Sequence, residues 1–117
     1  MIRQNNEKGS VSVSTSVYTD IVGTVASNCF GVKGMAARSV KDGVYHLLRM
    51  ESMSKGVNVT FHEDDSISID LHIIVDNGVN LKAVGEAIIS RVSHEVAEYT
   101  GTEVRAVNVY IDSMMID

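Results

Sequence analysis

The stretch VNVTFHEDDSISIDLHIIV, residues 57–75, decides the fold of this chain. Apolar side chains occupy alternate positions on both sides of a Glu-Asp-Asp turn, a period typical of two β-strands. Directly opposed residues of a hairpin share a face, so Phe61 must pair with an odd-numbered residue such as Ile67. The sequence therefore predicts a three-residue loop at 63–65 and a hairpin with one apolar and one polar face.

Two segments around this hairpin have the three-and-four spacing of amphipathic helices. The first spans about residues 15–29, and its expected buried face consists of Val17, Ile21, Val25, Ala26 and Cys29. The second begins after Asn80, which can cap it, and ends at Gly101. Its apolar positions are Leu81, Val84, Ile88, Val92, Val96 and Tyr99. Each helix therefore offers one apolar face to cover a sheet.

Shorter patterns predict three further strands. Residues 10–14 alternate serine with Val11 and Val13, which indicates a strand with one buried face. Residues 31–34 are predicted to form a turn after the first helix, and a strand follows it to about residue 40. The last strand covers about residues 103–112, where Val107, Val109 and Ile111 alternate with Asn108, Tyr110 and Asp112. Residues 41–55 have features of both a helical turn and a long loop, and both alternatives stay open.

These elements run in the order β-α-β-β-β-α-β. A sheet buried on both faces would consist of continuous apolar runs, whereas these strands alternate. The predicted fold is therefore α+β, a two-layer sandwich with one mixed sheet of four or five strands and both helices on one face. A single domain is expected at residues 9–112, between a loose segment at 1–8 and a C-terminal tail at 113–117.

Composition excludes several classes of protein. The chain has 117 residues, and its 10 basic and 15 acidic side chains give a net charge of −5, which argues against bulk nucleic-acid binding. No apolar run approaches the roughly 20 residues of a membrane span, and residues 1–8 lack the apolar core of a secretory signal. Cys29 is the single cysteine, which excludes an internal disulfide and fits a cytoplasmic location.

The histidines, the cysteine and the sequence motifs predict no enzyme, cofactor or metal site. His62 and His72 share the polar face of the hairpin, but at about 3.3 Å per residue they lie roughly 20 Å apart. Zinc ligands, in contrast, converge within about 2 Å of the ion. Cys29 has no neighbouring base in the sequence, and neither a P-loop nor a dinucleotide fingerprint is present.

Charge is distributed unevenly along the chain. Residues 33–55 have a net charge of +3 and residues 56–117 a net charge of −8. The basic segment is therefore predicted to contact an acidic face of a second copy or of a protein partner. Its basic residues are Lys33, Arg38, Lys41, Arg49 and Lys55. The apolar tail residues Met114, Met115 and Ile116 can pack either on the chain's own core or on another subunit.

Residues 31–34, with the sequence GVKG, match the four-residue loop by which KH modules clamp a nucleic-acid backbone. Together with the basic segment, this match supports an alternative function as a small RNA-binding module. In this chain, however, the loop is expected to link a helix to a strand rather than two helices. Nucleic acid therefore ranks behind protein as the expected partner.

The ordered set of landmarks in this chain resembles the alkaline shock protein family of Gram-positive bacteria, also called the envelope stress response family. The landmarks are Gly9, the helix with Val17, Ile21, Val25 and Ala26, GVKGM at 31–35, KGV at 55–57, DLHIIV at 70–75, Gly78, YTG at 99–101 and VNV at 107–109. They extend over the whole domain expected at residues 9–112.

This resemblance implies a small cytoplasmic, non-enzymatic protein with a part in cell-envelope homeostasis. Some members of the family are similar to scaffolds held near the membrane by an integral partner, and self-association is typical. The family has no catalytic motif to carry over. The expected function is therefore that of a homo-oligomeric scaffold linked to envelope stress, with a membrane-anchored protein as a candidate partner and no direct membrane insertion.

Overall fold

The computed structural model describes residues 2–38, 45–47 and 56–115. The predicted order β-α-β-β-β-α-β is confirmed, with two further strands, β1 and β4. The helices are α1 (Thr15–Ser27) and α2 (Leu81–Thr100). The strands are β1 (Ile2–Asn6), β2 (Gly9–Val13), β3 (Val32–Arg38), β4 (Tyr45–Leu47), β5 (Val57–Phe61), β6 (Ile67–Asp76) and β7 (Val104–Met115). The chain thus has the predicted α+β class.

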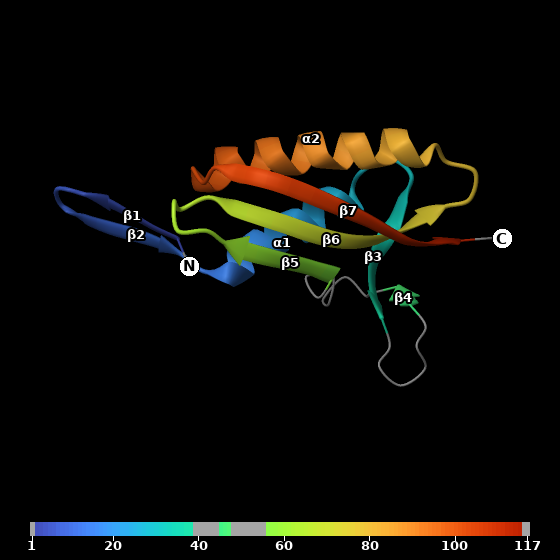
Figure 1. Cartoon of the computed structure of the whole chain (residues 1–117), viewed down its shortest axis with the longest axis horizontal. Helices are drawn as coiled ribbons and strands as arrows, with labels where there is room; N and C mark the ends of the chain where they lie inside the picture. Colours follow the sequence, from blue (N-terminus) through green and yellow to red (C-terminus); the bar gives the residue numbers. More distant parts are fainter. Residues whose placement is uncertain (1, 39–44, 48–55, 116–117) are drawn as a thin grey trace.

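β6 is the central strand of the main sheet (Figure 1). β7 runs parallel to β6 along one edge, and its register extends over the whole length of β6. On the other edge, β5 pairs with the first half of β6 and β3 with the second half, both antiparallel. β4, which belongs to the segment left open by the sequence, adds to β3. The sheet is therefore mixed and five-stranded, as predicted.

The hairpin between β5 and β6 has the predicted register. Phe61 pairs with Ile67, and the amide of His62 donates to the carbonyl of Ser66 at 2.9 Å across the three-residue loop. Asp65 closes this loop with a φ of 64°, a left-handed conformation that aspartate tolerates better than most residues. The parity argument from the sequence is confirmed.

The core lies between β6 and the two helices. Every odd-numbered residue of β6 is fully buried: Ile67, Ile69, Leu71, Ile73 and Val75 each have 0% exposure. They form one cluster with buried residues of both helices, which places α1 and α2 on the same face of the sheet. Burial of one such side chain contributes about 1.5–3 kcal/mol, so β6 is the main stabilising strand.

The prediction for the buried face of α1 was partly wrong. Val25, Ala26 and Cys29 are buried as predicted, but Val17 is 41% exposed. Tyr18 takes its place with 0% exposure, because its hydroxyl finds a hydrogen-bond partner in Thr102 at 2.7 Å. Both faces satisfied the helical spacing, and only the tertiary partner of the tyrosine decided between them.

α2 has the predicted ends and most of the predicted face. The Asn80 side chain accepts a hydrogen bond from the amide of Ala83 at 3.0 Å, and Gly101 ends the helix with a φ of 70°. Val84, Ile88, Val92 and Val96 are buried. Leu81 and Tyr99, at the two ends of the predicted stripe, are instead 42% and 74% exposed because the helix extends past the core.

The N-terminal region differs from the prediction. Residues 1–8, expected to be loose, contain β1, which pairs with β2 in a separate two-stranded sheet that projects from the domain (Figure 1). Val11 of β2 is 58% exposed, so this strand has no buried face at that position. Alternation over five residues predicted an extended chain correctly, but it could not identify the pairing partner.

The last strand is longer than predicted. β7 continues to Met115, and residues 113–115 pair with β6 instead of forming a tail. Met114 packs against the core, which is the first of the two alternatives left open for this region. Ile116 lies outside the described residues.

Candidate binding surfaces

The sheet has one face that the helices leave uncovered. Since α1 and α2 lie on the other side, the side chains that alternate with the core residues point to this face. They come from β5 and its end, from β6 and from β7. These nine residues, called the open face below, are Asn58, Thr60, His62, Ser68, Asp70, His72, Asn108, Tyr110 and Asp112.

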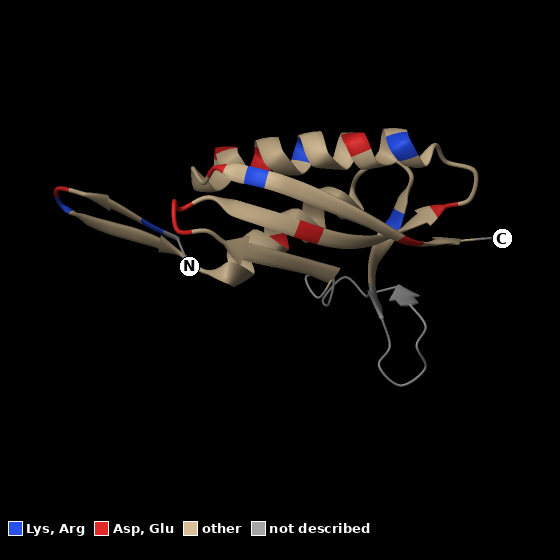
Figure 2. Ribbon diagram, in the orientation of Figure 1, with Lys and Arg blue, Asp and Glu red and all other residues tan. Residues whose placement is uncertain are grey.

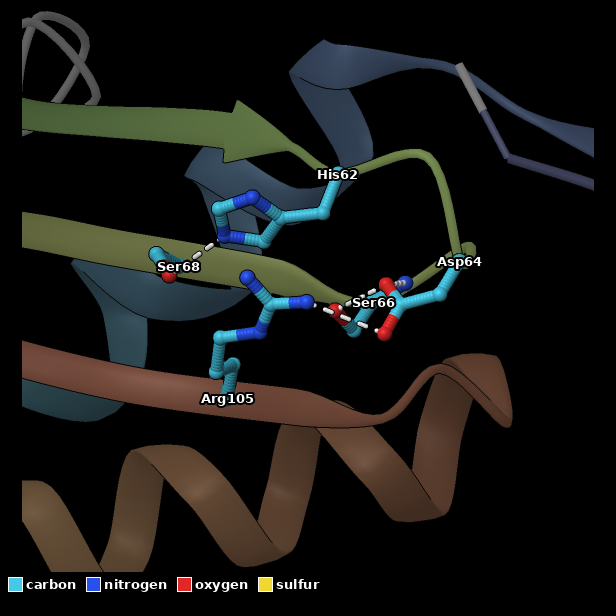
Figure 3. A network of polar contacts seen from close by, with 5 residues as sticks. All are labelled: His62, Asp64, Ser66, Ser68 and Arg105. Atoms are coloured by element: carbon cyan, nitrogen blue, oxygen red, sulfur yellow. Dashed lines mark hydrogen bonds and ion pairs between the residues drawn. The ribbon is translucent and has the colours of Figure 1, made fainter.

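At the hairpin end of the open face, polar contacts connect the β5–β6 turn to β7 (Figure 3). The Asp64 carboxylate accepts hydrogen bonds from the Ser66 hydroxyl at 2.6 Å and from the Ser66 amide at 3.1 Å. Arg105 Nη2 lies 3.0 Å from the second carboxylate oxygen. The bonds from Ser66, with help from Arg105, lower the pKa of Asp64 from 3.8 to about 2. Beside them, His62 Nε2 and the Ser68 hydroxyl are 2.7 Å apart.

The centre of the open face is also bonded laterally, from strand to strand. Asn108 Nδ2 donates to Asp70 Oδ1 at 2.8 Å, and His72 Nδ1 lies 2.8 Å from Asp112 Oδ2. The His72 ring stacks on Tyr110, with centroids 4.8 Å apart and planes 15° from parallel. Tyr110 nevertheless remains 48% exposed. A held tyrosine among bonded polar groups is a composition typical of protein-binding surfaces.

Two β-bulges of β7 lie at its charged residues. The register with β6 shifts twice, and the residues of β7 left without a partner at these shifts are Arg105 and Asp112. Bulges re-aim side chains, and these two reach Asp64 and His72 respectively. The sequence alternation predicted the polar face but could not predict these pairs, whose members are 41 and 40 positions apart.

The other histidines and the cysteine lie elsewhere. His94 pairs with Glu98 at 2.9 Å on the exposed side of α2, and the side chain of His46 lies outside the described residues. Cys29 is buried, and its thiol donates to the carbonyl of Val25 at 3.3 Å. Within residues 2–38, 45–47 and 56–115, no three His, Cys, Asp or Glu side chains are placed to hold a metal ion.

The structure brings three of the predicted contact residues to the C-terminal end of β6. Lys33 Nζ lies 4.0 Å from Asp76 Oδ1 in an exposed pair, a type worth about 0–1 kcal/mol. On the other side of β6, Asp76 pairs with Met115, which is 38% exposed, and the neighbouring pair includes Met114. The remaining predicted contacts lie outside the described residues: the side chain of Arg38, and Lys41, Arg49, Lys55 and Ile116.

Residues 31–34, expected to be a loop, lie where the chain passes from α1 to β3, and residues 32–34 belong to β3 itself. Gly31 has a φ of 85°, and a Cβ atom there would lie 2.9 Å from Val84 Cγ2 of α2. The close approach of the helix therefore accounts for this glycine. Lys33 lies at an irregularity of β3, and its ammonium faces Asp76. Neither observation favours a nucleic-acid backbone at this loop.

On the helical side, a groove of about 300 Å³ separates α1 from α2. Apolar Ile21 and Val25 line it together with Asp20, Glu95 and Tyr99. Acidic residues occur along α2, at the turn between β5 and β6 and on the strands of the sheet (Figure 2). The acidic excess of the second half of the chain is thus spread over the molecule rather than gathered in one patch.

Comparison with known proteins agrees with the fold. The geometry is that of a small two-layer α+β domain with an exposed, laterally bonded sheet face. A model of the alkaline shock protein 23 family, described as having a cell envelope-related function, matches residues 3–116. The chain belongs to this family, and the resemblance found in the sequence is confirmed.

Relatives in two genera align over nearly the whole chain. The protein YloU of Bacillus subtilis is 32% identical over 116 residues, which cover 98% of this chain and 96% of YloU. The protein Spy1614 of Streptococcus pyogenes is 34% identical over 116 residues, which cover 98% of this chain and 95% of that protein. The matches therefore concern the entire domain and not one motif.

Among solved structures, a variant of the MamM C-terminal domain has a similar fold. Its TM-score is 0.50, with 14% sequence identity over 84% of this chain and 93% of that chain. At this identity the similarity concerns the fold alone. Neither α1 nor α2, the two helices of the described residues, combines the length and the apolar character of a membrane span.

Proposed function

We propose that this chain is a non-catalytic scaffold protein that serves its envelope-related role through self-association and contacts with protein partners. The open face is the observation that carries this proposal, because its polar groups bond to one another across three strands. In this proposal the protein works in the cytoplasm and reaches the membrane through an anchored partner. The family's cell envelope-related function supports this setting.

The chemistry of the open face suits a protein partner. Tyr110 presents a large ring that is already held by His72, so its ordering on binding has a small entropic cost. Two positions along the same strands, Asp70 and Asn108 are hydrogen-bonded to each other. Such polar surroundings can exclude water around a central aromatic anchor, the arrangement found at energetic centres of protein interfaces.

The same contacts support a structural role for His72. A histidine held by a carboxylate is a familiar base, but a nucleophile must also lie within hydrogen-bond reach. The contacts described for His72 are the Asp112 carboxylate and the Tyr110 ring. In our proposal, the pair therefore orients the tyrosine and does not activate a substrate.

The experiment compares two tyrosines on opposite sides of the molecule. A tagged chain is cross-linked in its native cell, and the envelope fraction is purified with membrane proteins retained. Tyr110→Ser should reduce capture of the specific envelope partner at least about tenfold, as expected for an aromatic anchor worth about 2 kcal/mol. Tyr99→Ser, which removes an exposed tyrosine from the helical side, should leave capture unchanged.

Two results would contradict the proposal. Equal capture by the wild type and both variants would show that the open face does not bind the partner. A chain that is monomeric at every concentration in sedimentation equilibrium would contradict self-association.

A further inference from the structure

β7 forms one of the edges of the main sheet. β7 pairs with β6 on one side, and no other described strand pairs with it. Between its two bulges, residues 106–111 read AVNVYI, without charge, glycine or proline. Edge strands are normally protected by charges, proline or bulges within the strand. This six-residue stretch has none of these, so its outward backbone groups are open to pairing.

α2 lies beside this edge, and one of its flanks extends past β7. α1 contacts β3 and β5 on one half of the sheet, whereas α2 contacts β7 on the other half. The flank of α2 that faces α1 bears Arg91 and Glu95, since Arg91 reaches Cys29 and Glu95 lines the groove between the helices. The opposite flank of α2 therefore lies beyond β7.

This outer flank is apolar and has free space. Leu81 and Ile89 lie on it, on the opposite side of the helix from Arg91 and Glu95. Their side chains are 42% and 41% exposed. Gly85 lies between them, and a Cβ atom added there would have no neighbour within 4 Å. A strand added to β7 would cover this flank. The unpaired backbone edge of β7 therefore lies beside an apolar helix surface.

We propose that β7 of a second copy of this chain occupies this edge, antiparallel to the first and related to it by a twofold axis. The proposal rests on the self-association in the proposed function and names the surface responsible. Such an axis stands perpendicular to the sheet and keeps the open faces on one side. Paired residues must then have the same parity within residues 106–111, so either Asn108 or Val109 faces its own symmetry mate.

Charge complementarity favours a second copy over an unrelated strand. Arg105 and Asp112 border the uncharged stretch at opposite ends, and both point to the open face. Antiparallel pairing brings Arg105 of one copy toward Asp112 of the other at each end, so unlike charges meet twice. Within the stretch no like charges oppose each other. The surface is therefore complementary to itself.

Disulfide trapping tests the register directly. In a Cys29→Ser background, Asn108→Cys and Val109→Cys are each oxidised at a concentration where the wild type is dimeric. One of the two should form a covalent dimer, because opposed residues of antiparallel strands lie about 4.5–5.5 Å apart, within disulfide range. Asn58→Cys, an exposed site on β5, is the matched control and should stay monomeric under the same conditions.

A charge substitution tests the energetics. Asn108→Lys should raise the dimer dissociation constant at least about tenfold, because two like charges then meet near the axis. Asn58→Lys places the same charge on β5 and should leave the constant unchanged. Ile89→Glu should weaken the dimer as well, because it places a charge on the apolar outer flank of α2 that the second copy covers. Circular dichroism of each variant establishes that it is folded before its mass is measured.

The outcomes separate this inference from the proposed function. If the wild type self-associates but neither cysteine cross-links and Asn108→Lys has no effect, the β7 pairing is wrong while self-association stands. A wild type that is always monomeric overturns both. Loss of envelope-partner capture by Ile89→Glu, a site outside the open face, without any change in the dimer dissociation constant would overturn the second copy in favour of a partner's strand at this edge.

Discussion

β6 and β7 are parallel neighbours in one sheet, and they illustrate two different uses of the same alternating pattern. β6 has strands on both edges, and its odd-numbered side chains are fully buried. β7 has a strand on one edge, two bulges, and apolar residues such as Val109 and Ile111 that are only partly buried. Position in the sheet, not strand propensity, separates the stabilising strand from the exposed one.

The difference shows how this small domain combines a stable core with an exposed candidate binding surface. The core is concentrated on β6, where five side chains meet both helices. β7 is consequently free to carry the bulges that direct Arg105 and Asp112 to the open face. Substitutions in β6 should therefore affect folding, and those in β7 mainly association.

The largest expected effect is a core truncation in β6. Ile69→Ala should lower the free energy of unfolding by about 2–5 kcal/mol, because it removes buried methyl groups and leaves a cavity. Val109→Ala, on the core-facing side of β7 opposite Leu71, should cost about 1 kcal/mol because this side chain is only partly buried. Urea denaturation measures both, and equal losses would contradict the claim that β6 stabilises the fold more than β7 does.

A smaller effect is expected from the contact that attaches the start of β7 to α1. The Tyr18 hydroxyl and Thr102 Oγ1 form a buried hydrogen bond of 2.7 Å just before β7 begins. Tyr18→Phe leaves the Thr102 hydroxyl without this partner and should cost about 1–2 kcal/mol in thermal or urea unfolding. Tyr110→Phe, at a half-exposed ring, is the control and should change stability by less. A Tyr18→Phe protein as stable as the control would show that β7 does not depend on this bond.

A still smaller change in stability is expected at the edge itself. Asn108→Lys, measured at a concentration where the chain is monomeric, should stay within about 0.5 kcal/mol of the wild type, as exposed substitutions usually do. Its new ammonium can pair with Asp70, which replaces the lost amide hydrogen bond. Asn58→Lys on β5 should behave alike. A large loss confined to Asn108→Lys would mean that β7 stabilises the monomer more than its exposure suggests.

The smallest effect concerns the ion pair at the beginning of β7. The pKa of Asp64 is lowered from 3.8 to about 2, so its contribution to stability is fully present above the unfolded value. That contribution is lost as the pH falls through about 2. The difference in stability between wild type and Asp64→Asn should shrink over this range.

Carboxyl NMR titration gives a direct check on this pair. The wild-type Asp64 resonance should titrate near 2, and Arg105→Gln should move its pKa upward, though less than Ser66→Ala because the bonds from Ser66 are the larger cause. An Asp64 carboxyl that titrates at its ordinary value would show that the network in Figure 3 does not persist in solution.

Much of the architecture could be predicted because the relevant signals are local. Period-two alternation and the parity of the 63–65 loop predicted the hairpin register, and Asn80 and Gly101 predicted the ends of α2. The buried face of α1 was less predictable, because two overlapping stripes have the same spacing. The bonds formed by Tyr18 and Gln4 with residues 102 and 100 connect distant parts of the chain and have no local signal.

The binding surfaces were only partly predictable. Alternation assigned His72, Asn108 and Asp112 to a polar face, but the bulges that make Arg105 and Asp112 partners of Asp64 and His72 depend on how β6 and β7 meet. The predicted basic segment lies largely outside the described residues. Lys33, the basic residue of this segment whose side chain is described, pairs with Asp76. The exposed Tyr110 was predicted to lie on the polar face, but its stacking on His72 was not predicted from the sequence.

The sequence by itself determined the α+β class, the order of elements, the hairpin register and the separation of apolar from polar strand faces, because each depends on periodicity within a short stretch. Only the tertiary structure decided that β7 ends the sheet, that β1 and β2 form a separate hairpin, and that α2 extends beyond the β7 edge. These features depend on which distant segments meet. An open edge is a property of the assembled sheet, since every strand has the same backbone groups until a neighbour pairs with them.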